Sequence, residues 1–313
     1  MNYKSFFFAC RLYYMTRVGL YIFIVAIAAS CSDRPILDNP TDDFLPGKRL
    51  AELTNKKLDE VSGIASSIQH DGYLWAHNDS KNGTEVYLID KQLRIAMTCK
   101  LVGVENRDWE DIAVGPGPEA GKSYVYVGEI GDNNAKYRFK RVFRFQEPEN
   151  IQQGVVDIVD FDTIIFRLPA KKDAETLMID PITKNLYIVS KREDPVFVYE
   201  LQYPYSTKDT LHAKEVLSLP LTQIVSGDIS ADGKQVLLKN YEYVYYWNNP
   251  HGKPLLELLR ERPWDVPYEE EAQGESITWA RDGSGFYTLG EKSITMDTYL
   301  YFYQRKSSIV AKP

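Results

Sequence analysis

A short sequence pattern recurs about every 50 residues after residue 60, and this repeat restricts the fold more than any other feature of the chain. Each copy has the form of a short apolar strand, a tight turn and a second strand. In three copies the turn contains Asp-Gly, a pair typical of hairpins because glycine readily takes a positive φ angle. The copies begin at Ser62, Glu110, Glu175, Gly227 and Glu275. The chain therefore reads as a series of β-hairpin units.

Each unit also contains two further strands. A third strand follows the hairpin at 85–89, 141–145, 196–200, 243–247 and 298–303, and a fourth precedes the next unit at 98–102, 161–168, 213–219 and 255–259. Four strands per unit at this period are typical of a β-propeller blade. We therefore predict an all-β protein, a β-propeller of five four-stranded blades with six as the alternative. The propeller domain is predicted at residues 47–305 and a tail at 306–313.

The last unit has no fourth strand after it, whereas a predicted strand at residues 48–53 precedes the first unit without a partner. Pairing this strand with the last blade would close the ring and cover two open sheet edges. We therefore predict that an N-terminal strand closes the propeller.

The first 31 residues have the layout of a bacterial export signal. Residues 1–30 contain basic but no acidic side chains, and an apolar run at 18–29 ends in small residues directly before Cys31. The run is shorter than the roughly 18 residues expected of a membrane span. Small residues before a cysteine resemble a lipobox, although Ala28 stands where leucine is more common, and Met15 is an alternative start.

These features predict a lipoprotein signal peptide and lipidated cysteine at residues 1–31, with Cys31 as the lipid site. Residues 32–46 contain three prolines and four acids and are predicted to form a flexible tether. The predicted location is the cell envelope, where the lipid holds the protein to a bacterial membrane, on the outer-membrane or periplasmic side. An ordinary signal peptide or an uncleaved anchor is the alternative.

Charge and cysteine content limit the partners. The chain has 37 basic and 44 acidic residues, and removal of the signal would leave 34 against 44. An acidic surface repels phosphate backbones, so nucleic acid is excluded as a partner. Cys99 would be the single cysteine left, which rules out an internal disulfide and is typical of a small buried strand residue. We expect a monomer.

Acidic residues stand at the start of the innermost predicted strands. Because the blades are antiparallel, these strand starts and the loops after the second strands should share one face, around the channel mouth. Oxygen ligands crowded in this way suit Ca²⁺, the one cofactor predicted here. The candidate metal ligands are Glu60, Glu110, Asp111, Glu175, Asp228 and Glu275. The candidate ligand-binding residues are Asn78, Asp79, Glu129, Asp132, Asn133, Arg192 and Lys239.

Two alternatives to a metal site remain open. Lysine and arginine side chains of the same loops could neutralise the acids, or the acids could cap strand amides. Zinc is less well supported, because the four histidines lie in separate segments without a recognisable ligand spacing. A triad of Ser80 or Ser62 with His77 and Asp79 lacks a nucleophile elbow.

Several motifs of the first two blades resemble secreted bacterial propeller proteins of mostly unassigned function. The motifs are Val61-Ser-Gly-Ile-Ala with Leu74-Trp-Ala-His-Asn-Asp-Ser, and Asp108-Trp-Glu-Asp-Ile-Ala with Gly128-Glu-Ile-Gly-Asp-Asn. The acid at each innermost strand is also, more distantly, similar to the phytase-like and lactonase-like propellers. That resemblance implies a divalent ion at the channel mouth, but their complete catalytic sets have no counterpart here.

The sequence therefore favours a cell-envelope lipoprotein with a propeller that binds a small polar or glycan ligand, or a protein partner, at an acidic channel mouth. The alternative is a metal-dependent hydrolase of phosphoesters or lactones, in which Arg192, Lys191 or Lys239 would face substrate anions. Whether the protein is an enzyme is left open by the sequence.

Overall fold

The computed structural model of the chain describes residues 39–306. The predicted signal peptide, the predicted lipid site Cys31 and tether residues 32–38 lie outside the described residues. The helices of the described part are short, η2 at Lys56–Leu58 and α2 at Leu255–Leu258. None of its helices is long and apolar enough to cross a membrane.

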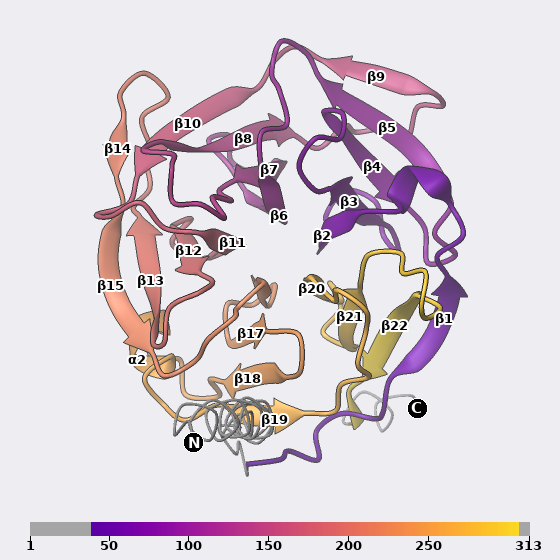
Figure 1. Cartoon of the computed structure of the whole chain (residues 1–313), viewed down its shortest axis with the longest axis vertical. Coiled ribbons are helices and arrows are strands. Elements are labelled where there is room, and N and C mark those ends of the chain that lie inside the picture. Colours follow the sequence, from indigo (N-terminus) through magenta and orange to yellow (C-terminus); the bar gives the residue numbers. More distant parts are fainter. Residues whose placement is uncertain (1–38, 307–313) are drawn as a thin grey trace, which may run out of the picture. The chain divides into compact units, whose positions relative to one another are not determined.

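Five β-sheets surround one central axis, and each sheet is one blade of a propeller (Figure 1). The innermost strands of neighbouring blades contact one another around the whole ring. The predicted five-bladed propeller is confirmed.

In each blade the first three strands from the central axis follow one another along the chain. From inside to outside, blade 1 contains β2 (Val61–Ser66), β3 (Leu74–Asn78), β4 (Glu85–Ile89), β5 (Ile95–Leu101) and β9 (Val155–Ile158), and blade 2 contains β6 (Trp109–Pro116), β7 (Ser123–Glu129), β8 (Lys140–Gln146), β10 (Asp162–Arg167) and β14 (Leu211–His212). Blade 3 contains β11 (Ala174–Ile179), β12 (Leu186–Ser190), β13 (Val196–Leu201) and β15 (Lys214–Leu219), and blade 4 contains β16 (Ser226–Ile229), β17 (Gln235–Lys239), β18 (Val244–Asn248) and β19 (Trp264–Val266). Blade 5 contains β20 (Ser276–Trp279), β21 (Gly285–Leu289), β22 (Tyr299–Gln304) and, outermost, β1 (Lys48–Glu52).

The N-terminal strand closes the ring as predicted. β1 pairs antiparallel with β22, with Lys48 opposite Phe302 and Glu52 opposite Tyr299. The first and last strands of the described chain therefore lie side by side in blade 5 (Figure 1). This pairing leaves no blade with a missing outer strand.

The outer strands differ from the prediction in two respects. Residues 255–259 are not the fourth strand of blade 4, because Leu255–Leu258 form the short helix α2 after Pro254, and the fourth strand is β19. Blades 1 and 2 each carry a fifth strand in parallel pairing, β9 beside β5 and β14 beside β10. Both additional strands come from long connections that carried no hairpin signal.

The propeller begins earlier than predicted, because residues 39–46 pack against it. Phe44, assigned to the flexible tether by its sequence neighbours, is 2% exposed. Its ring contacts Tyr246 and Phe286, with centroids 5.3 and 5.2 Å away. The backbone of this segment also bonds to blade 5, where Leu45 N–H donates to Gln304 O at 2.8 Å. The free energy gained by burying the aromatic ring holds this segment on the propeller, although the neighbouring sequence is polar and rich in proline.

The apolar core lies between neighbouring blades, and two carboxylates, the buried Asp111 and the partly exposed Asp228, join their inner strands. Asp111 of β6 accepts hydrogen bonds from Leu177 N–H of β11 at 2.9 Å and from Ser226 Oγ of β16 at 3.2 Å. Asp228 of β16 accepts from Trp279 N–H of β20 at 2.9 Å. Both acids thus satisfy strand donors that packing has removed from water.

Candidate functional site

A bulge occurs at the start of the innermost strand in three successive blades. In β2, β6 and β11 the strand register shifts across one residue, which is Ser62, Glu110 and Glu175 respectively. A β-bulge inserts an extra residue and turns its side chain away from the regular alternation. The bulges therefore place two of the predicted acids on the same side of the ring, near its axis.

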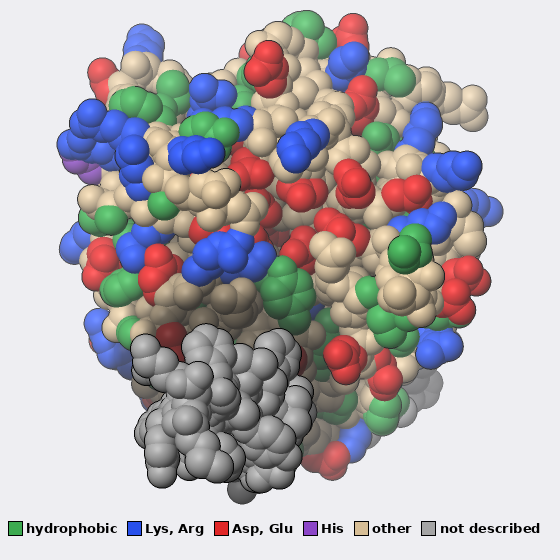
Figure 2. All heavy atoms as spheres, viewed as in Figure 1, with side chains coloured by type: hydrophobic (Ala, Val, Ile, Leu, Met, Phe, Trp, Pro, Cys, Tyr) green, Lys and Arg blue, Asp and Glu red, His purple; other side chains and the backbone are tan. Residues whose placement is uncertain are grey.

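Five carboxylates gather at this place. Their oxygens form two groups that share Glu110, and within each group the oxygens lie within 4.8 Å of one another. Figure 2 shows acidic side chains concentrated at the centre of this face of the propeller. We call these residues the acidic centre: Asp79, Asp108, Glu110, Asp173 and Glu175.

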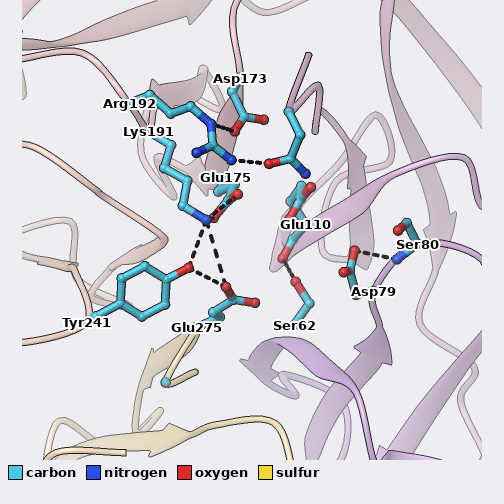
Figure 3. Close-up of polar contacts among 12 residues, drawn as sticks. Ser62, Asp79, Ser80, Glu110, Asp173, Glu175, Lys191, Arg192, Tyr241 and Glu275 are labelled. Carbon is cyan, nitrogen blue, oxygen red and sulfur yellow. Dashed lines mark hydrogen bonds and ion pairs between the residues drawn. The ribbon is translucent and has the colours of Figure 1, made fainter. Parts of the chain in front are cut away.

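Glu110 lies at the middle of the acidic centre (Figure 3) and is 5% exposed. Its main-chain oxygen accepts a hydrogen bond from Ser62 Oγ at 2.6 Å, but its carboxylate has no hydrogen-bond partner among residues 39–306. A side chain at Gly131 would overlap the Glu110 and Asp108 carboxylates, so the glycine allows them to approach. A buried carboxylate without a partner is energetically costly unless a proton or a cation compensates it.

Lys191 neutralises one side of the acidic centre. Its Nζ lies 2.6 Å from Glu175 and 3.8 Å from Glu275, and it donates to Tyr241 Oη at 2.8 Å (Figure 3). Tyr241 in turn donates to Glu275 at 2.6 Å. Burial alone would lower the pKa of Lys191, but the surrounding acids Glu175, Glu275 and Glu110 raise it. Lys191 is therefore charged, and its ammonium group is occupied by Glu175, Glu275 and Tyr241.

Arg192 neutralises a second acid at the edge. Its Nε donates to Asp173 Oδ2 at 2.7 Å, and its guanidinium also donates to Asn133 (Figure 3). Asp173 accepts a further bond from Asp132 N–H at 2.8 Å. On the other side, no lysine or arginine forms an ion pair with Asp79, Asp108 or Glu110 among the described residues. Within the acidic centre, Glu175 and Asp173 are therefore neutralised by basic side chains, whereas the charges of the other three acids are not compensated.

The uncompensated acids hold their protons more tightly than usual. Burial, with the neighbouring charges of Asp79 and Asp173, raises the pKa of Asp108 to about 6. Burial followed by repulsion from Glu175 and Asp79 raises the pKa of Glu110 well above its ordinary value. Such shifts are expected where like charges converge without a counter-ion. A divalent cation at this place would compete with these protons.

Other predicted site residues have different environments. Asp111 and Asp228 bond strand donors inside the fold, which agrees with the strand-capping alternative and removes them from the candidate metal ligands. Glu60 is exposed and accepts a bond from the Asn82 amide. Glu275 is held by Tyr241 and Lys191, next to the acidic centre but in neither carboxylate group.

Three predicted ligand-binding residues are buried in internal pairs. Glu129 contacts Arg141 at 3.1 Å, and Asp132 lies 3.6 Å from Lys140. Lys239 is fully buried and donates to Tyr268 Oη at 3.1 Å and to Gly274 O. These side chains cannot reach a ligand outside the fold. Asn78 uses its amide to donate to Lys57 O at 2.9 Å.

Sequence reasoning missed Asp108 and Asp173 as members of the acidic centre. Each stands just before an innermost strand, two residues ahead of Glu110 and Glu175 respectively. The recurrence of Asp-x-Glu before both strands was the available signal. Of the predicted ligand-binding residues, Asp79 belongs to the acidic centre, and Arg192 contacts its member Asp173 (Figure 3) and also donates to Asn133; whether they bind a ligand stays a prediction.

The fold and the acid-lined axis define a five-bladed β-propeller with a candidate cation site. No protein family profile matches the sequence, and no curated protein matches it. The fold is similar to the PQQ-bound aldose sugar dehydrogenase of Streptomyces coelicolor, at 12% identity, with 82% of this chain and 96% of that chain covered and a TM-score of 0.47. It is also similar to the hydrazine synthase of Kuenenia stuttgartiensis, at 12% identity, with 79% and 84% covered and a TM-score of 0.44. Likeness at this level carries no information on function.

Proposed function

We propose that this protein is a cell-envelope lipoprotein whose propeller binds a divalent cation, Ca²⁺ first of all, at the acidic centre. The bound cation would in turn hold a small polar or glycan ligand. The observation that carries the proposal is the Glu110 carboxylate, which is buried, has no hydrogen-bond partner among the described residues and is common to both carboxylate groups.

The oxygen supply of the acidic centre fits calcium. Ca²⁺ takes six to eight oxygen ligands, and carboxylates bind it with one or both oxygens. Asp79, Asp108 and Glu110 offer these oxygens without a competing ion pair in the part of the chain that the structure describes. Asp79 and Asp108 are partly exposed, so a cation held by them would keep positions open for water or for hydroxyl groups of a glycan.

Calcium binding should weaken when Glu110 is replaced. We expect the wild-type protein to release or absorb heat on titration with Ca²⁺ and to melt at a higher temperature in Ca²⁺ than in chelator, because a ligand of the folded state stabilises it. Glu110→Gln should weaken binding by about tenfold or more, since it removes the shared charged ligand. Isothermal titration calorimetry and thermal melts measure both effects.

The matched control is Glu119→Gln, which removes one exposed carboxylate outside the acidic centre. It should bind Ca²⁺ like the wild type. Absence of heat and of any melting shift with Ca²⁺, Mg²⁺ and Mn²⁺ would contradict the cation proposal. The ligand part is checked by a glycan array probed in Ca²⁺ and in chelator, where equal signals would argue against a cation-held ligand.

The hydrolase alternative is less well supported by these contacts. It requires basic side chains that face substrate anions, but Lys191 and Arg192 are engaged with Glu175 and Asp173, and Lys239 is buried. A binding function needs only the uncompensated acids. A substrate screen of phosphoesters and lactones with Ca²⁺, Mn²⁺ or Zn²⁺ separates the two, because turnover that Glu110→Gln abolishes would favour the hydrolase.

The membrane anchor belongs to the same proposal. Its support is the apolar run followed by small residues and Cys31. Cells supplied with a radiolabelled fatty acid should label the wild-type protein and leave Cys31→Ser unlabelled. Equal labelling of both would exclude lipidation at this cysteine.

A further inference from the structure

A second candidate site lies on the outer part of blade 2, away from the acidic centre. It is a cavity of about 550 Å³ at the end of β10, where the chain leaves for blade 3. Four nitrogen-bearing side chains line it, together with apolar residues, and its lining includes no carboxylate from residues 39–306. We call it the basic pocket: Arg138, Arg167, Leu168, Pro169, Ala170, Lys171, His212 and Ala213.

The additional strand β14 fixes part of this pocket. β14 pairs parallel with β10, and the register sets Arg167 opposite His212. Their side chains meet, with Arg167 Nη2 3.2 Å from His212 Nδ1. Because arginine can only donate, Nδ1 of a neutral His212 accepts this bond and Nε2 carries the proton. Two donors of the basic pocket are therefore held by paired strands.

The cations of the basic pocket lack internal counter-ions. Among residues 39–306, Arg138, Arg167 and Lys171 form no ion pair with a carboxylate, whereas Lys191 and Arg192 at the acidic centre are both paired. Figure 2 shows Lys and Arg side chains gathered at the upper left, where Figure 1 places β10 and β14. A concentration of unpaired cations is unexpected in a chain with 37 basic and 44 acidic residues.

We propose that the basic pocket binds the phosphate group of a polar ligand. Arginine matches phosphate geometry with two parallel N–H donors, and lysine adds a point charge. The cavity also has room for the polar part that carries the phosphate. The same chemistry would recognise a free phosphorylated solute or the headgroup of an anionic lipid.

The test compares two variants that lose equal charge. The pocket variant carries Arg138→Gln, Arg167→Gln and Lys171→Gln; the control variant carries Lys48→Gln, Lys234→Gln and Arg262→Gln, which are exposed and outside the pocket. Calorimetry with glycerol 3-phosphate, against glycerol, tests a free phosphate ester. Flotation with phosphatidylcholine vesicles, with and without phosphatidylglycerol, tests a lipid headgroup, and an attached lipid would act equally in both vesicle types.

We expect phosphate-dependent binding in one of the two arms, weakened about tenfold or more in the pocket variant and unchanged in the control variant. The arm that responds identifies the source of the phosphate. Absence of phosphate-dependent binding in both arms would overturn the proposal. Equal losses in the two variants would also overturn it, because they would indicate a general charge effect. Neither result bears on Ca²⁺ binding at the acidic centre.

Discussion

Phe44→Ala should lower the free energy of unfolding by about 3–5 kcal/mol, the range for removing a buried phenylalanine ring. Phe44 is 2% exposed and packs edge-on against Tyr246 and Phe286, and the Arg305 guanidinium lies 5.1 Å from the ring centroid. The surrounding rings belong to strands of two blades, so they cannot collapse into the space. Urea unfolding followed by circular dichroism measures the change.

The control for Phe44 is Phe139→Ala, which removes a ring that is 42% exposed. Exposed substitutions usually change stability by about 0.5 kcal/mol or less. A similarly small effect of Phe44→Ala would mean that residues 39–46 do not pack on the propeller in solution. The comparison therefore decides whether this segment is tether or core.

Lys191→Met should destabilise the protein by about 3–5 kcal/mol near neutral pH, because removal of one partner leaves a buried charge uncompensated. Lys191 lies 2.6 Å from Glu175 and 3.8 Å from Glu275, and all three side chains are buried. Methionine keeps the length of the side chain without its charge. Urea unfolding at several pH values measures the loss.

The loss should grow with pH. The folded-state pKa of Glu175 is already raised above its ordinary value of 4.5, mainly by burial, and loss of the lysine raises it further. A carboxyl with a raised folded pKa contributes stability below its unfolded pKa and loses that contribution as pH rises through the folded value. The difference from wild type should thus be smallest below pH 4.5.

The matched control is Lys292→Met, because Lys292 forms an exposed pair with Asp59 at 3.5 Å. Exposed pairs contribute about 1 kcal/mol or less. Equal losses in the two variants, or a loss independent of pH, would show that Lys191 does not compensate buried acids.

The sequence predicted the architecture well because its signals are local. Asp-Gly turns such as Asp232-Gly233 fix hairpins by backbone conformation, and Gly233 does have a φ of 71°. The closing strand at 48–53 was predicted from edge pairing alone. In contrast, 255–259 is a short apolar run that period alone cannot assign to strand or helix. The parallel edge strands β9 and β14 pair with strands far away along the chain and leave no local signal.

The acidic centre was predicted only in part, because neighbouring residues of a strand point to opposite faces. Glu110 and Asp111 are adjacent, yet Glu110 faces the axis and Asp111 bonds to the next blades. The bulge at Glu110 decides this, and a bulge is a property of strand register that the sequence does not reveal. Lys191 and Lys239 are both buried, but Lys191 pairs with Glu175 whereas Lys239 donates to Tyr268 Oη and Gly274 O, and the sequence does not distinguish these environments.

Closure by β1 also sets the order in which the ring can assemble. The hairpins of every blade pair residues that are near in the chain, but β1 must wait for β22, the last strand of the described chain. Pairing of β1 with β22 closes a loop of nearly the whole described chain. The loss of conformational entropy is large, so this pairing is expected late in folding. A chain threaded through a membrane from its N-terminus would hold the ring open until its last strand had crossed. For a chain exported in this way, as proposed above, completion of the fold would depend on completion of export.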